Sequence, residues 1–274
     1  MSGFVTELAN AWERNDSLLC VGLDPEIERF PRTILAEPSP IFQFSKGVID
    51  ATADLVCAYK LQFAHYASYE AEDQLERTIE YIHRTYPGMP VILDGKRGDV
   101  GHTAERYAIE AFERYGADAV TVNPYLGTDS LEPFLARADK GVIVLCRTSN
   151  PRAGDLQDLE TTRGKLYQVV ADLAATRWNA RGNCLLVVGA TYPRELAEVR
   201  ARVGDMALLV PGVGAQQGDV AQVVQNGRTS AGTGLIISSS RAILYASAGV
   251  DFAGAAREVA QQLRNSINQA RRTR

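Results

Sequence analysis

Short apolar runs recur along the chain and are separated by stretches with helical periodicity. The apolar runs are Leu18–Leu23, Leu55–Phe63, Val91–Asp94, Ala119–Asn123, Val142–Arg147, Leu185–Val188, Ala207–Val210 and Leu235–Ile237. Their hydrophobicity is continuous rather than alternating, which is typical of strands buried on both faces of a parallel sheet. The clearest helical stretches between and after them are Glu70–Tyr86, Thr103–Tyr115, Leu166–Arg181 and Ala253–Ala270. The pattern therefore predicts an α/β fold in which strands and helices alternate.

The number of apolar runs narrows the architecture further. Eight buried strands with intervening helices favour a closed (β/α)8 barrel of the TIM type over an open doubly wound sheet. No linker or low-complexity tract divides the chain, so one domain over residues 1–274 is predicted. The polar segment Asn150–Arg163 is predicted to be a long loop after the fifth strand. The basic tail QQLRNSINQARRTR is predicted to be helical, with a solvated face and a frayed end.

Composition excludes several classes of protein. The chain has 274 residues, 46% of them hydrophobic and 23% charged, as in an ordinary globular protein. Its formal net charge of −4 provides no global basic field for nucleic acid, so an anionic ligand must be held by local groups. The start of the chain is amphipathic and acidic, unlike a signal peptide, and no apolar run approaches the roughly 20 residues of a membrane span. We therefore expect a cytoplasmic protein without membrane contact.

The cysteines and histidines give no sign of a metal site. Each cysteine lies in or beside an apolar run, and no CxxC pair occurs; the four are Cys20, Cys57, Cys146 and Cys184. They are predicted to be buried free thiols of a cytosolic protein. The three histidines (His65, His83 and His102) lack the spacing of metal ligands. Neither a metal nor a cofactor is predicted.

Polar residues gather where the predicted strands end, although the strand interiors are apolar. They include Asp24, Lys60, Asp94, Lys96, Asn123, Ser149, Gln216 and Arg241. Because active sites of (β/α)8 barrels lie at the carboxyl ends of the strands, this asymmetry places the site at that face of the barrel.

The third apolar run leads directly into the charged sequence Asp94-Gly-Lys96-Arg-Gly-Asp99. If strand geometry continues to Lys96, Asp94 and Lys96 project from the same face, about 7 Å apart. Charges at the tip of a buried strand are costly unless they are paired, and the same holds for Lys60 within its apolar run. These three residues are predicted to be functional. Asp99 and Thr103 have a second interpretation, because either could cap a helix that begins near Gly101.

The remaining candidates suggest a phosphate site and a polar contact. The segment Gly212–Gly218 has the wrong glycine spacing for a dinucleotide fingerprint and is predicted to be a loop whose backbone approaches a phosphate. Arg241, just past the eighth strand, would supply a forked donor to phosphate oxygens. Ser149 is predicted to form hydrogen bonds rather than to act as a nucleophile. Asp24 precedes Pro25, so a simple turn is its alternative interpretation.

Together these residues resemble the signature of the orotidine 5'-phosphate decarboxylases. The segment from Asp94 to Asp99, followed by Thr103, is similar to the form found in the longer bacterial branch (type 2) of that family. Further similar segments are Gly22-Leu23-Asp24, Tyr59-Lys60, Asn123–Gly127, Thr148–Pro151 and Pro211–Gln216. The chain departs from the family pattern at three positions: Ser240 and Gln217 stand in place of glycines, and Gly95 stands in place of an alanine.

The resemblance implies decarboxylation of orotidine 5'-monophosphate (OMP) to uridine 5'-monophosphate (UMP) without metal or cofactor. It implies that Asp94 lies against the substrate carboxylate and that Lys96 protonates the ring carbon. The other implied roles are ribose binding by Asp24 and Lys60, pyrimidine binding by Ser149, a bridge from base to phosphate by Gln216, and phosphate binding by Arg241. It further implies a homodimer in which Asp99 and Thr103 reach into the neighbouring subunit's site.

Two other functions are compatible with parts of this pattern. The first is a magnesium-dependent decarboxylase or aldolase of the same barrel group that acts on a sugar phosphate. Such relatives carry a metal-binding glutamate where this chain has Lys60, so the lysine argues against a metal. The second is a nucleotide-binding barrel without catalytic activity. The presence of Lys60, Asp94, Lys96 and Asp99 argues against such a loss of activity.

Overall fold

A ring of parallel strands forms the centre of the molecule. The structure is a computed structural model that describes residues 3–213 and 219–273. In this part of the chain eight strands close into the barrel: β1 (Leu19–Leu23), β2 (Ala58–Gln62), β3 (Val91–Arg97), β4 (Ala119–Val122), β5 (Gly141–Arg147), β8 (Cys184–Val188), β9 (Leu208–Pro211) and β10 (Leu235–Ser239). Each pairs in parallel with the next, and β10 returns to β1. The predicted (β/α)8 barrel is confirmed, with one strand in each apolar run.

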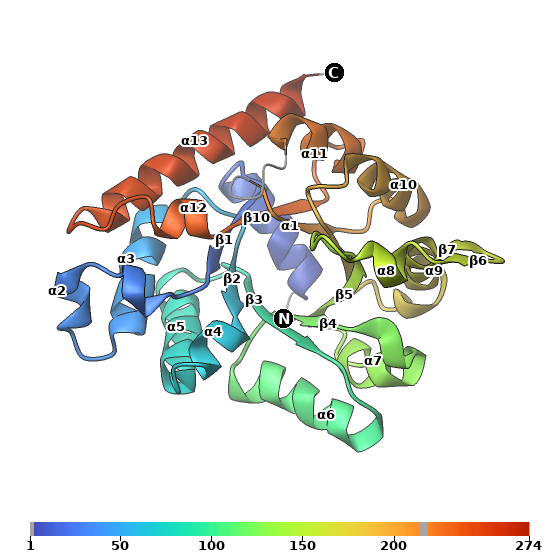
Figure 1. Cartoon of the computed structure of the whole chain (residues 1–274), viewed down its shortest axis with the longest axis horizontal. Coiled ribbons are helices and arrows are strands. Elements are labelled where there is room, and N and C mark those ends of the chain that lie inside the picture. Colours follow the sequence, from blue (N-terminus) through green and yellow to red (C-terminus); the bar gives the residue numbers. More distant parts are fainter. Residues whose placement is uncertain (1–2, 214–218, 274) are drawn as a thin grey trace.

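Helices cover the outside of the ring (Figure 1). The longer ones are α1 (Phe4–Arg14), α3 (Pro40–Thr52), α5 (Glu72–Thr85), α6 (Gly101–Ile109), α7 (Thr128–Leu135), α9 (Leu166–Leu173), α10 (Pro193–Val203), α11 (Val220–Gly227) and α13 (Phe252–Arg272). Shorter helical segments are η1 (Ile27–Arg29), α2 (Arg32–Leu35), α4 (Phe63–Ala67), η3 (Pro124–Leu126), α8 (Gly154–Gln157) and α12 (Arg241–Leu244). Two π-helical turns, η2 (Glu110–Arg114) and η4 (Ala174–Trp178), extend α6 and α9. In α5 the buried residues Leu75, Ile79 and Ile82 recur at helical spacing, so one stripe of the helix faces the strands.

The interior of the barrel is closed at the amino ends of the strands by α1, which crosses the middle of the ring in Figure 1. Phe4 and Leu8 of this helix belong to the same apolar cluster as inward-facing residues such as Cys20 and Ile92. All four cysteines are buried free thiols, as predicted. Burial raises the pKa of the Cys20 thiol to about 12, so it stays protonated beneath the cavity.

The segment after β5 is more ordered than the predicted loop. It contains α8 and a small antiparallel pair of strands, β6 (Glu160–Thr161) and β7 (Gly164–Lys165). The buried side chain of Arg147 at the end of β5 donates to Gln157 and Asp158, at 3.2 and 3.0 Å. These contacts fold the segment back over the strand end. The prediction of an irregular loop over Asn150–Arg163 is therefore wrong.

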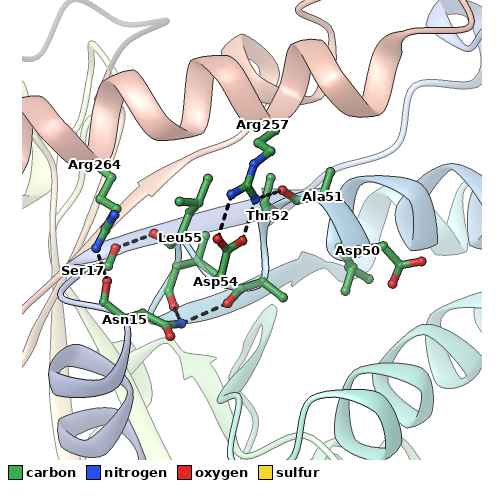
Figure 2. A network of polar contacts seen from close by, with 12 residues as sticks. Asn15, Ser17, Asp50, Ala51, Thr52, Asp54, Leu55, Arg257 and Arg264 are labelled. Carbon is green, nitrogen blue, oxygen red and sulfur yellow. Dashed lines mark hydrogen bonds and ion pairs between the residues drawn. The ribbon is translucent and has the colours of Figure 1, made fainter.

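The basic tail is also more than a solvated face. It is the second half of α13, where Ile267 and Asn268 are buried, and its helix continues to Arg272. Figure 2 shows Arg257 and Arg264 reaching from α13 to the segments that precede β2 and β1. Arg257 forms a two-pronged pair with Asp54, at 2.6 and 2.8 Å, and Arg264 donates to the carbonyl of Asn15 at 2.6 Å. These arginines bind a carbonyl and a carboxylate at the floor of the barrel. Their partners could not be inferred from the basic composition of the tail.

We infer that the barrel and its flanking helices form one domain, because α1 closes the floor and α13 packs on α3 and α11. If so, truncating a buried tail residue lowers the stability of the whole fold. Ile267→Ala is expected to reduce the free energy of unfolding by about 2–5 kcal/mol, as for other buried isoleucines. Urea denaturation at a fixed protein concentration measures this.

The matched control is Gln262→Ala, on the exposed face of the same helix, which is expected to change stability by less than about 0.5 kcal/mol. Equal effects of the two substitutions would show that the tail folds apart from the barrel. Within residues 3–213 and 219–273, none of the helices has the length and apolar character needed to cross a membrane.

Candidate active site

A cavity of about 470 Å³ opens at the carboxyl ends of the barrel strands. Six of the predicted site residues line it: Asp24, Lys60, Asp94, Lys96, Ser149 and Arg241. They come from segments that are far apart in the sequence and are brought together by closure of the barrel. Leu145, Val187 and Leu209 add apolar surface to the wall. The cavity therefore combines apolar surface with charged groups, as ligand sites commonly do.

Charged side chains of β2 and β3 form a connected array in this cavity. The Nζ atoms of Lys96 and Lys60 lie 2.7 and 2.9 Å from the two carboxylate oxygens of Asp94. Lys60 also lies 3.6 Å from Asp24 Oδ1 at the end of β1. The side chains of Lys60 and Asp94 are 5% and 10% exposed, whereas that of Lys96 is 47% exposed. Lys96 is thus the member of the array that projects most into solvent.

Mutual pairing keeps the buried members of the array charged. Burial alone would raise the pKa of Asp94, but the ammonium groups of Lys60 and Lys96 outweigh it and hold that pKa well below its usual range. Burial alone would lower the pKa of Lys60, but the carboxylates of Asp24 and Asp94 outweigh it and raise the pKa above its ordinary value. The site therefore presents a fixed carboxylate and a fixed ammonium at neutral pH.

The backbone at Lys96 differs from the regular strand that the sequence suggested. The pairing of β3 with β4 shifts register between Leu93 and Arg97, and Lys96 has a φ of 45°. This left-handed conformation is disfavoured for a residue with a side chain and costs of order 1–3 kcal/mol, which contacts with the surrounding structure must offset. Strand β3 nevertheless runs through Lys96 to Arg97, and the side chains of Asp94 and Lys96 lie together as expected, in direct contact.

The neighbouring residue, Arg97, fixes this segment. Its guanidinium donates two hydrogen bonds of 2.9 Å to Glu110. It also lies over the rings of Phe63 and Tyr107, at 4.2 and 4.9 Å from their centroids. Arg97 is therefore held by a fork-shaped ion pair and by two aromatic faces.

Asp99 and Thr103 do not line the cavity of their own chain. Helix α6 begins after Asp99 and contains Thr103; its N-cap position is Val100, and it has no side-chain capping bond. Asp99 instead accepts a hydrogen bond from the backbone N–H of Val100, at 2.8 Å. The interpretation of these two residues as helix caps is therefore wrong.

The phosphate-binding candidates are placed in part. Arg241 lines the cavity together with Gly212 and Val213. Gly212 has a φ of 99°, which favours glycine at that turn. Gln216 and Gln217 lie outside the described residues. Ser240 packs closely against β1, because a Cβ atom at Gly22 would lie 1.9 Å from its hydroxyl oxygen.

Several polar residues of the cavity were not predicted from the sequence, among them Gln62, Thr121 and Gln157. Gln62 donates to Asp94 Oδ2 at 3.1 Å, and its position two residues after Lys60 was a usable signal, since alternate strand residues share a face. Thr121 donates to Asp94 Oδ1 at 2.8 Å. Gln157 accepts from the backbone N–H of Thr148 at 2.9 Å, next to Ser149. In the described ranges, His, Cys, Asp and Glu side chains form no group of three or more suited to a metal ion.

Comparison with known proteins gives consistent similarities over nearly the whole chain. The profile of the orotidine 5'-phosphate decarboxylase / HUMPS family matches residues 17–258. The orotidine 5'-phosphate decarboxylases of Azoarcus sp. (strain BH72) and Ralstonia pickettii (strain 12J) are 61% and 62% identical, over 97% and 98% of this chain and 98% and 99% of theirs. The solved structure of Leishmania donovani OMP decarboxylase superimposes with a TM-score of 0.85 at 38% identity, covering 100% of both chains.

Proposed function

The chain belongs to the orotidine 5'-phosphate decarboxylase / HUMPS family and decarboxylates OMP in pyrimidine biosynthesis, and we propose that the Asp94–Lys96 pair at the barrel mouth carries out this reaction. The observation that carries the proposal is the position of Asp94. Its carboxylate is held between the ammonium groups of Lys60 and Lys96, within the cavity formed by the strand ends.

In this proposal the bond between the ring carbon and the carboxylate breaks, and its electron pair stays on the ring carbon. Lys96 Nζ stabilises the developing negative charge and then donates its proton to that carbon. Asp94 lies beside the substrate carboxylate, where repulsion is unfavourable before the reaction and is relieved as carbon dioxide leaves. We propose that neither a metal nor a cofactor takes part.

Binding of the rest of the nucleotide is assigned to the other residues of the cavity. Asp24 Oδ1 is buried without a hydrogen-bond partner among the described residues, so it can accept from a ribose hydroxyl, with Lys60 beside it. Ser149 would bond the pyrimidine, and Gln216, outside the described residues, would bridge base and phosphate. Arg241 would bind the phosphate. Binding energy from this remote group can offset the repulsion at the carboxylate.

We further propose that the protein is a homodimer in which Asp99 and Thr103 complete the partner's site. Exposed apolar side chains lie beside Asp99: Val100 is 53% exposed, and Tyr125 and Leu126, after β4, are 74% and 45% exposed. The two loops adjoin, because a Cβ atom at Gly98 would lie 3.3 Å from Asn123. A second copy of the chain would cover this apolar surface and bring Asp99 to a cavity.

Mixing two inactive variants tests the shared site. Asp94→Ala and Asp99→Ala chains are each expected to be inactive, but a mixed dimer has one site in which both residues are intact. After co-refolding of equal amounts, about a quarter of wild-type activity per total site is expected, because half of the dimers are mixed and each has one intact site.

The control is co-refolding of Asp94→Ala with Lys96→Ala. In the proposed dimer one chain supplies both Asp94 and Lys96 to a site. Each site of the mixed dimer therefore lacks one of these two residues, and the mixture stays inactive. Equal activity of the two mixtures, or none in either, would contradict a site shared through Asp99.

The two rival functions are less consistent with this geometry. In the magnesium-dependent relatives a glutamate binds the metal, whereas Lys60 here pairs with Asp94 and Asp24. An inactive nucleotide-binding barrel would not need to keep Lys96 in a disfavoured backbone conformation. A cytoplasmic location is proposed from the four buried free thiols, since thiols remain reduced there.

A further inference from the structure

Thr121 is a buried threonine of β4, 1% exposed, whose hydroxyl contacts both members of the Asp94–Lys96 pair. Its Oγ1 atom accepts from the backbone N–H of Lys96 at 2.9 Å and donates to Asp94 Oδ1 at 2.8 Å. We propose that Thr121 is a positioning residue for decarboxylation, which fixes Lys96 and Asp94 relative to each other. This inference rests on the proposed roles of those two residues.

The direction of both hydrogen bonds is determined by chemistry. A backbone N–H can only donate, so the hydroxyl oxygen must be the acceptor in its bond with Lys96. An ionised carboxylate can only accept, so the hydroxyl proton must point to Asp94. Asp94 is ionised because its pKa is held low by the two lysines. One hydroxyl therefore links the main chain of Lys96 to the side chain of Asp94 in a single defined orientation.

These bonds close a ring with the ion pair. Lys96 Nζ lies 2.7 Å from the same oxygen, Asp94 Oδ1, that accepts from Thr121. The other oxygen, Oδ2, accepts from Lys60 and Gln62 at 2.9 and 3.1 Å. The hydrogen bond from Thr121 is thus a contact of Asp94 Oδ1 that does not depend on the Lys96 ammonium. When Lys96 gives up its proton its pairing with Asp94 weakens, but the bond from Thr121 remains.

The backbone of Lys96 is where this support is needed. With a φ of 45° the residue departs from regular strand conformation, and the register of β3 against β4 shifts between Leu93 and Arg97. Arg97 fixes the chain on one side through Glu110, but it does not contact Asp94. Thr121 holds the Lys96 peptide from the barrel side. A small displacement of a reacting group lowers turnover without preventing binding.

The test compares Thr121→Val, which keeps the shape of the side chain but lacks the hydroxyl, with Thr121→Ser, which retains it. Thr121→Val is expected to lower kcat for OMP by about 10- to 100-fold, the range for loss of a hydrogen bond to a charged group. The dissociation constant of UMP, which lacks the reacting carboxylate, is expected to change by less than about twofold. Thr121→Ser is expected to keep kcat within about threefold of the wild type.

The control for loss of a buried hydroxyl is Thr78→Val, because Thr78 is fully buried in α5, outside the cavity, and donates to the Gln74 carbonyl. It is expected to leave kcat unchanged. If Thr121→Val does not fold, Thr121→Ala is measured instead, with the same expectation. Equal kcat for Thr121→Val and Thr121→Ser would overturn the positioning role of Thr121. If Lys96→Ala were inactive in the same assay, the proposed function would stand. Loss of UMP binding in Thr121→Val would assign the residue to binding instead. An inactive wild-type enzyme would instead refute the proposed function.

Discussion

Lys96→Ala is expected to lower kcat for OMP by about 10⁴-fold or more. The substitution removes the proton donor, which contributes a factor of about 10² to 10⁴ to the rate. It also removes the ammonium that faces the developing negative charge, which contributes a further factor of about 10² to 10³. Lys96 is also the most exposed member of the array, at 47% of its side chain, so its ammonium is available to a ligand in the cavity. Steady-state kinetics on the purified variant measure the loss.

The variant should still bind the nucleotide. Phosphate and ribose contacts are assigned to other residues, so the dissociation constant of UMP is expected to change by less than about tenfold. Lys46→Ala serves as the comparison, since it removes an ammonium paired with Asp50 in α3, outside the cavity. Turnover by Lys96→Ala comparable to that of the wild type would show that another group protonates the carbon.

Asp94→Asn is expected to lower kcat by about 10³-fold and, unlike Lys96→Ala, to tighten the binding of OMP. Asp94 lies within 2.9 Å of both ammonium groups, so an amide there leaves two cations facing the substrate carboxylate. Attraction in the ground state then replaces repulsion, and the advantage gained when carbon dioxide departs is lost. Because the variant turns over slowly, the dissociation constant of OMP can be measured directly by equilibrium binding.

UMP provides the internal control for this variant, because it has no carboxylate at the reacting carbon. Its affinity for Asp94→Asn is expected to stay within about threefold of the wild-type value while that for OMP rises. Weaker binding of both nucleotides in the same proportion would indicate that Asp94 acts only by supporting Lys60. Stronger binding of OMP alone is the result expected from ground-state repulsion.

The strands and the charged residues of the cavity could be predicted from the sequence because both depend on local patterns. Buried parallel strands appear as continuous apolar runs, and polar residues at the run ends identified Asp24, Lys60, Asp94, Lys96, Ser149 and Arg241. The proximity of Asp94 and Lys96 was also expected, because residues two positions apart on a strand share a face. The left-handed backbone at Lys96 and the direct contact of the two side chains were not expected.

What the sequence could not show depends on partners that are distant along the chain. Thr121 looks like an ordinary strand residue, and its function follows only from the register that sets β4 against Lys96. Arg264 looks like part of a solvated basic face, but its partner is a carbonyl 249 residues away. In each case the residue type was visible and its partner was not.

We propose that the Asp94–Lys96 array decarboxylates OMP without a metal. The most direct test of this claim follows the change in ultraviolet absorbance as OMP becomes UMP, with the purified wild-type protein in excess chelator and Lys96→Ala beside it as the background. We expect the wild type to turn over OMP at the same rate with and without chelator and Lys96→Ala to show almost none. Wild-type turnover no greater than that of Lys96→Ala, or abolished by the chelator and restored by magnesium, would contradict the claim.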